Sequence, residues 1–170
     1  MDCTPPGSSV HQISQTRILE WVGYRTPKRN AIMEYKAQGN VVILRLEKGE
    51  EIISSLLSLI EKLNIKSGRV SGIGATNKIT IGVFNTATNE YTKKTIEEEM
   101  EILSLSGNLS RMNGTPYVHV HGAFASLGNV YGGHLNEAII SATGEMVIDL
   151  FDVEVEREFN KEIGLNLIKL

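Results

Sequence analysis

Three of the four histidines in the sequence lie close together, at positions His119, His121 and His134. Imidazole is the commonest metal ligand among protein side chains, and three imidazoles with one open position form a recurring type of zinc site. The chain has one cysteine, so a CxxC zinc or redox motif is excluded, and an all-imidazole ligand set favours zinc among the divalent ions. These residues therefore predict a zinc site within residues 117–137.

His119 and His121 lie in residues 117–126, a segment rich in residue types that favour strands. Because successive side chains of a strand point to opposite faces, two histidines separated by one residue project from the same face. The alternative interpretation is structural, since a histidine in a half-buried strand often hydrogen-bonds to the backbone or to a carboxylate and binds no metal. Three histidines together favour the metal site over this alternative.

His134 must reach the same place from a different segment. Residues 127–129 (Leu-Gly-Asn) are typical of a hairpin, which would return the chain alongside the preceding strand. Gly132 and Gly133 directly precede His134, and glycine readily adopts the positive φ angles that turns require. We therefore expect a glycine turn that directs the third imidazole inward.

The chemistry of such a site depends on whether the ion keeps an open position. A zinc-bound water has a lowered pKa and can act as a nucleophile or a general base, which would allow hydrolysis. Closure of that position by a carboxylate or a neighbouring subunit would instead leave a structural ion. Four carboxylates are candidates for orienting the imidazoles through hydrogen bonds: Glu137, Glu145, Asp149 and Asp152.

The elements that must position these residues are mostly strands. Residues 50–64 have apolar side chains at three- and four-residue steps, including Leu56 and Ile60, which predicts one amphipathic helix. The strand-like segments are residues 41–46, 67–75, 78–85, 90–96, 100–110, 117–126 and 138–155. Many strands and few helices predict an α+β fold, with one main amphipathic helix packed on a central sheet.

The first 32 residues differ from the rest of the chain. They contain a Pro-Pro-Gly-Ser-Ser run and no lasting helical or strand periodicity. We therefore expect a poorly ordered N-terminal extension over residues 1–32 and one domain over residues 33–170. Residues 1–21 also resemble the in-frame translation of a mammalian interspersed repeat, which makes Met33 a candidate for the ancestral start.

Charge and hydropathy narrow the range of partners. Residues 34–170 contain 13 Lys and Arg against 18 Asp and Glu, a net charge of −5, which opposes the counterion-driven binding of DNA. No apolar run reaches the length of a membrane span and no secretory signal is recognisable, so we expect no membrane partner and a cytoplasmic location. The glycine-rich residues 71–77 complete neither a P-loop nor a dinucleotide fingerprint.

Residues 33–170 resemble the PPC domain, also called DUF296, a family of prokaryotic proteins and of plant AT-hook nuclear proteins. The resemblance is carried by four motifs in order, which are EILSLSGN at 101–108, PYVHVH at 116–121, YGGHL at 131–135 and EREF at 156–159. It implies an α+β subunit with a central antiparallel sheet and a homotrimeric assembly. It also implies zinc at His119, His121 and His134, as in the prokaryotic members.

The sequence departs from the plant members of that family. The AT-hook core Arg-Gly-Arg-Pro is absent, and the plant Gly-Arg-Phe-Glu segment is replaced by Glu-Glu-Met-Glu at residues 98–101. In the plant proteins the AT-hook, and not this domain, contacts the DNA minor groove. The DNA-binding function ascribed to the prokaryotic type is therefore an analogy with the plant proteins.

These observations predict a PPC-domain protein of the DNA-binding or regulatory kind that carries a three-histidine zinc site and acts beside a DNA or protein partner. Direct DNA contact by the domain is disfavoured by its charge. A zinc-dependent enzyme that acts on a small molecule is the alternative, and a purely structural assembly is the third hypothesis. The metal content of the purified protein and its affinity for duplex DNA separate these hypotheses.

Overall fold

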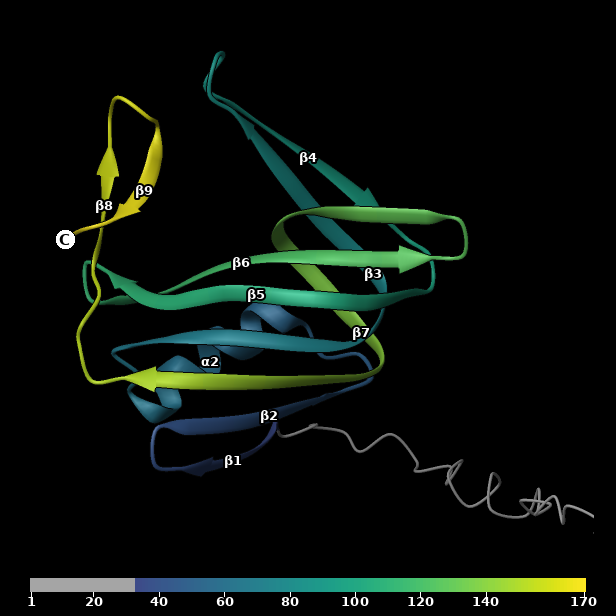
Figure 1. The fold of residues 1–170 in the computed structure, drawn as a ribbon, viewed down its shortest axis with the longest axis horizontal. Helices are drawn as coiled ribbons and strands as arrows, with labels where there is room; N and C mark the ends of the chain where they lie inside the picture. Colours follow the sequence, from purple (N-terminus) through teal and green to yellow (C-terminus); the bar gives the residue numbers. More distant parts are fainter. Residues whose placement is uncertain (1–32) are drawn as a thin grey trace, which may run out of the picture. The chain divides into compact units, whose positions relative to one another are not determined.

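The computed structural model describes residues 33–170, and the expected N-terminal extension, residues 1–32, lies outside the described residues. Within the described range the elements are, in chain order, β1 (Glu34–Gln38), β2 (Val41–Glu47), α2 (Ile52–Leu63), β3 (Ser67–Asn85), β4 (Glu90–Ile96), β5 (Met100–Met112), β6 (Thr115–Ser126), β7 (Asn129–Phe151), β8 (Arg157–Asn160) and β9 (Leu165–Ile168). Antiparallel strands and one helix confirm the predicted α+β class (Figure 1).

Seven of these strands form one antiparallel sheet in the order β1-β2-β7-β6-β5-β3-β4, and β8 pairs with β9 in a separate hairpin. The long strands β3 and β7 also pair with each other, in addition to the neighbours that this order gives them. The sequence predicts two strands at residues 67–75 and 78–85, whereas the structure has one. The expected interruption at Thr76 and Asn77 is accommodated by irregular pairing with β7 near Thr76.

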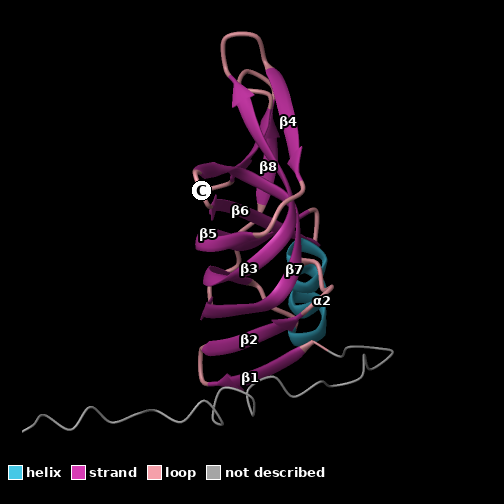
Figure 2. Cartoon of the chain, turned by 90° about the vertical axis from the view of Figure 1, so that its right-hand side faces the viewer, coloured by secondary structure: helices cyan, strands magenta, loops and turns pink. Residues whose placement is uncertain are grey.

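Helix α2 covers one face of the sheet (Figure 2). Its N-terminus is capped by Glu51, whose carboxylate accepts hydrogen bonds from the backbone N–H groups of Ile53 and Ser54. Its C-terminus is closed by Asn64 in the left-handed region, with a φ of 49°. The helix buries an apolar stripe formed by Ile52, Leu56, Leu59 and Ile60. Within residues 33–170, no helix has the length and apolar character needed to cross a membrane.

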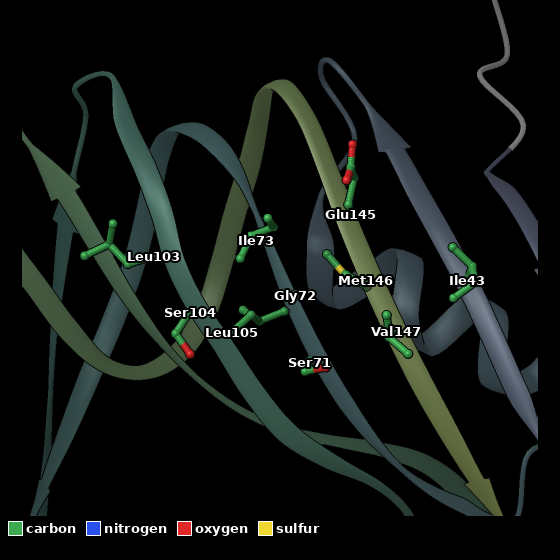
Figure 3. Close-up of a pocket in the computed structure, with 10 residues that line it drawn as sticks. All are labelled: Ile43, Ser71, Gly72, Ile73, Leu103, Ser104, Leu105, Glu145, Met146 and Val147. Carbon is green, nitrogen blue, oxygen red and sulfur yellow. The ribbon is translucent and has the colours of Figure 1, made fainter.

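The core lies between α2 and the sheet, and side-chain alternation decides which strand residues enter it. On β2, Val42 and Leu44 are fully buried, whereas Ile43 between them is 49% exposed. Phe124 on β6 is among the largest fully buried side chains. The opposite face of the sheet therefore keeps apolar side chains at the surface, where a hollow is lined by residues of β2, β3, β5 and β7 (Figure 3).

Candidate metal centre

The three histidines predicted to converge are brought together by neighbouring strands. His119 and His121 lie two residues apart on β6, and His134 on β7 pairs directly with His121. All three side chains therefore project from one face, with ring centroids 5.1–5.4 Å apart. One nitrogen from each ring lies within 4.8 Å of the others, so the three histidines could hold a metal ion.

The glycines before His134 do not form the expected turn. Gly132 and Gly133 lie inside strand β7, and neither is among the glycines of residues 33–170 that have positive φ. The reversal occurs earlier, between Ser126 and Asn129, as the hairpin prediction requires, and there Gly128 has a φ of 97°. His134 is aimed by its register opposite His121 rather than by backbone distortion.

Gly133 instead permits a close approach between strands. A Cβ atom at this position would lie 2.9 Å from the carbonyl oxygen of Gly82 on β3, which is closer than real Cβ atoms come to other atoms. The absence of a side chain lets β7 pack against β3 beside the histidines. This packing requirement accounts for a glycine at position 133 better than turn geometry does.

One pair of ring nitrogens has the spacing expected around a tetrahedral ion. Nε2 of His119 lies 3.3 Å from Nε2 of His121. Two nitrogen ligands at about 2.0–2.1 Å from a tetrahedral zinc ion are separated by about 3.3–3.4 Å. The pair therefore has the separation that zinc requires.

Arg157, at the start of β8, reaches the other side of His119. A parallel bridge between Arg111 and Glu156 places β8 against the end of β5. From there the guanidinium Nη2 of Arg157 lies 3.4 Å from Nδ1 of His119. The guanidinium also lies 4.8 Å from the ring centroid of Tyr117 on β6.

Arg157 is a buried residue, 5% exposed, and its guanidinium is held by neutral partners. Nε donates to Oγ of Ser110 at 2.9 Å, Nη1 donates to the carbonyl oxygen of Asn166 at 2.8 Å, and Nη2 donates to Oδ1 of Asn108 at 2.7 Å. In the sequence Arg157 stands out only as part of the EREF motif. No local pattern links it to His119, which is 38 positions earlier in the chain.

Burial and nearby positive charge favour the neutral form of two of the imidazoles, those of His119 and His134. Burial, followed by the charges of Arg157, His134 and His121, lowers the pKa of His119 to about 4. The pKa of His134 is also lowered, first by burial and then by the charges of His121, Lys93 and Arg157. Neutral imidazole is the form that binds metals, so these rings are in the metal-binding charge state at neutral pH.

Two of the four carboxylates expected to orient the imidazoles pair with basic side chains instead. Glu137 lies 3.5 Å from Nζ of Lys78, and Asp149 lies 2.7 Å from a guanidinium nitrogen of Arg69. Within residues 33–170, none of Glu137, Glu145, Asp149 and Asp152 makes a hydrogen bond to a histidine. The polar neighbour of His119 is the cationic Arg157, which sequence spacing did not indicate.

Comparison with known proteins finds a family model that matches more than half of the chain. Residues 33–152 match the model of the Plants and Prokaryotes Conserved (PCC) domain. The hairpin of β8 and β9, which carries Arg157, lies beyond the matched residues. No curated protein matches the chain.

Several solved structures share the fold. A candidate DNA-binding protein from Bacteroides thetaiotaomicron is 36% identical, with a TM-score of 0.78 over 81% of this chain and 96% of that chain. A metal-containing protein from Archaeoglobus fulgidus is 34% identical, with a TM-score of 0.73 over 82% of this chain and 99% of that one. A plant- and prokaryote-conserved (PPC) protein from Pyrococcus horikoshii is 28% identical, with a TM-score of 0.71 over 83% and 96% of the two chains.

Proposed function

The chain belongs to the Plants and Prokaryotes Conserved domain family, and from this premise we propose that it is a regulatory or binding protein whose three histidines hold zinc. The observation that carries the proposal is the 3.3 Å separation of the Nε2 atoms of His119 and His121, with His134 directly opposite on β7. The donor set fits zinc because all three ligands are imidazoles. The metal-containing relative from Archaeoglobus fulgidus supports the presence of an ion.

Metal analysis of the purified protein tests the zinc site. Wild-type protein should hold close to one zinc per chain, and His121→Ala should lose most of it, because only two of the three ligands remain. His11→Ala is the control for nonspecific imidazole binding, since His11 is the fourth histidine of the sequence. Equal and negligible zinc in wild type and His121→Ala would remove the proposed site.

We also propose that the chains assemble as a homotrimer, as the family resemblance implies. The support is the apolar face of the sheet opposite α2, where Ile43, Ile73 and Leu103 are 49%, 59% and 53% exposed around the hollow of Figure 3. Apolar side chains grouped in this way are typical of protein interfaces. Light scattering should give the mass of three chains for wild type and a smaller species for Leu103→Glu. A monomeric wild type would contradict the trimer.

Two of the solved relatives are named as candidate DNA-binding proteins, but the charge of this chain opposes direct and specific DNA contact. Residues 34–170 carry a net charge of −5. We therefore expect any contact with duplex DNA to stay in the nonspecific range of ~10⁻⁴–10⁻⁶ M at physiological salt, and DNA to be approached through a partner protein. A salt-dependent titration that gave a nanomolar, sequence-selective complex would refute this expectation.

A second function is favoured by the exposure of His121, which leaves the histidine cluster open to solvent on one side. A three-histidine zinc ion lowers the pKa of its bound water, which supports hydrolysis of a small molecule. In that function His119, His121 and His134 bind the ion, while burial beside Arg157 keeps His119 neutral. Hydrolysis of an activated ester that disappears in His121→Ala would favour the enzyme, and equal rates in both proteins would exclude it for that substrate class.

A further inference from the structure

A cationic side chain, that of Arg157, lies beside the histidine cluster. The buried guanidinium of Arg157 contacts Ser110, Asn108, Asn166 and His119, all of which are uncharged partners. The ion pairs found within residues 33–170 use Arg45, Arg69, Lys78 and Lys169, and none includes Arg157 or Lys93. A buried charge without a counterion is costly, so the positive charge beside His119 is unusual in a chain that is acidic elsewhere.

Lys93 of β4 lies in the same row of the sheet as the histidines. Lys93 pairs with Gly82 on β3, Gly82 pairs with His134 on β7, and His134 pairs with His121 on β6. Side chains of directly paired residues point to the same face, so Lys93, His134 and His121 project together.

Tyr91 lies near both Lys93 and His134. Gly82 has no side chain, and a Cβ atom there would overlap the phenol oxygen of Tyr91, so the glycine makes room for the ring. The Tyr91 ring lies 6.1 Å from that of His134 in an edge-on arrangement, and Nζ of Lys93 lies 5.6 Å from the centre of the Tyr91 ring. Nδ2 of Asn136 donates to the Tyr91 hydroxyl at 2.7 Å, which leaves the hydroxyl hydrogen free to be donated.

These groups define the charge of the ligand that the site can accept. Three neutral imidazoles leave the full charge of a divalent ion uncompensated, and Arg157 and Lys93 add positive charge around it. We propose that the metal centre is completed by a small oxyanion, a carboxylate or a phosphate, that binds the ion and pairs with Lys93. The proposal rests on the metal site argued above and adds the chemical class of its ligand. In it Arg157 contributes positive charge beside His119 without touching the anion.

Cobalt-loaded full-length protein provides the test, because the visible absorption of Co²⁺ reports a change of its ligands. Acetate and inorganic phosphate are titrated separately at constant ionic strength, and acetamide serves as a neutral probe of similar shape. We expect the two anions to change the spectrum at concentrations where acetamide does not. The relative strength of acetate and phosphate distinguishes a carboxylate from a phosphate ligand.

Two neighbouring lysines separate a specific contact from a general charge effect. Lys93→Gln should weaken anion binding by about fivefold, the effect of a partly exposed charge pair. Lys94→Gln is the matched control, because Lys94 is next on the strand and its Nζ lies 5.6 Å from the ring centre of Tyr131 instead. We expect Lys94→Gln to bind anions as wild type does.

The outcomes distinguish this proposal from the metal site itself. Cobalt binding without a spectral response to either anion would overturn the oxyanion ligand and leave the metal site standing. Equal weakening in Lys93→Gln and Lys94→Gln would overturn the pairing with Lys93, and an equal response to acetamide would overturn the requirement for charge. Failure of the wild-type chain to bind Co²⁺ or zinc would overturn both proposals.

Discussion

The low pKa of His119 makes a specific prediction for the stability of the metal-free protein. Burial first, and then the charge of Arg157, lowers this pKa from 6.5 to about 4 in the folded state. Between these two values the unfolded chain binds a proton that the folded chain does not bind. The free energy of unfolding must therefore fall as the pH is lowered through this range, in addition to any fall that carboxylates cause.

The size of the effect follows from the two pKa values. The separation between 6.5 and about 4 corresponds to about 3.4 kcal/mol at ~1.36 kcal/mol per pH unit. His119 is only partly buried, and solvent screens its interaction with Arg157, so we expect roughly half of that energy, ~1–2 kcal/mol. The loss should be largely complete at about pH 4, where the folded-state ring begins to protonate.

Urea unfolding in the presence of a chelator measures this contribution. Wild type and His119→Gln are compared at about pH 7.5 and about pH 4.5 and at one protein concentration, because oligomerisation would otherwise shift the apparent stability. The glutamine keeps an acceptor for Arg157 but cannot titrate. Wild type should lose ~1–2 kcal/mol more than His119→Gln on acidification. Identical losses, or a wild type that gains stability in acid, would refute the argument from burial and charge.

Other substitutions test the fold that carries the site. Phe124→Ala should lower the free energy of unfolding by ~3–5 kcal/mol because it empties a fully buried position, whereas Phe124→Leu should cost much less; urea unfolding measures both. Gly107→Ala should lower the melting temperature by several degrees, because the new Cβ would overlap the carbonyl oxygen of His119. Gly132→Ala is the control, because the nearest atom to its Cβ, the carbonyl oxygen of Gly122, is 3.4 Å away. Equal melting temperatures of the two variants would contradict this packing argument. Deletion of residues 1–32 should leave the melting temperature and zinc content unchanged, because the buried core residues lie between Val42 and Ile148. A large fall in the melting temperature or in the zinc content would show that the domain boundary is wrong.

Features that depend on near neighbours in the chain were predictable. The helix expected at residues 50–64 is found at Ile52–Leu63, because its apolar repeat, its N-cap and its C-terminal asparagine all act within a few residues. The hairpin at residues 127–129 was also predictable, since Gly128 supplies the positive φ of a short turn.

Features that depend on strand partners were not predictable in the same way. The glycine pair predicts a turn at Gly132 and Gly133, but both residues are part of β7, where Gly133 packs closely against β3. Likewise, a strand expected to end at Ala75 continues as β3, because irregular pairing with β7 accommodates the interruption. A glycine indicates either a turn or a close approach, and only the neighbouring strand decides between them.

The sequence by itself determined that His119 and His121 share one face, because side-chain alternation along a strand is a local property of the backbone. Only the tertiary structure decided that His134 lies opposite His121, that Lys93 shares their row, and that Arg157 contacts His119 from a separate hairpin. Register and hairpin packing depend on contacts between residues far apart in the chain. The shared face of His119 and His121 can therefore be read from neighbouring positions in the sequence, whereas the charged groups around the histidines are known only once the chain is folded.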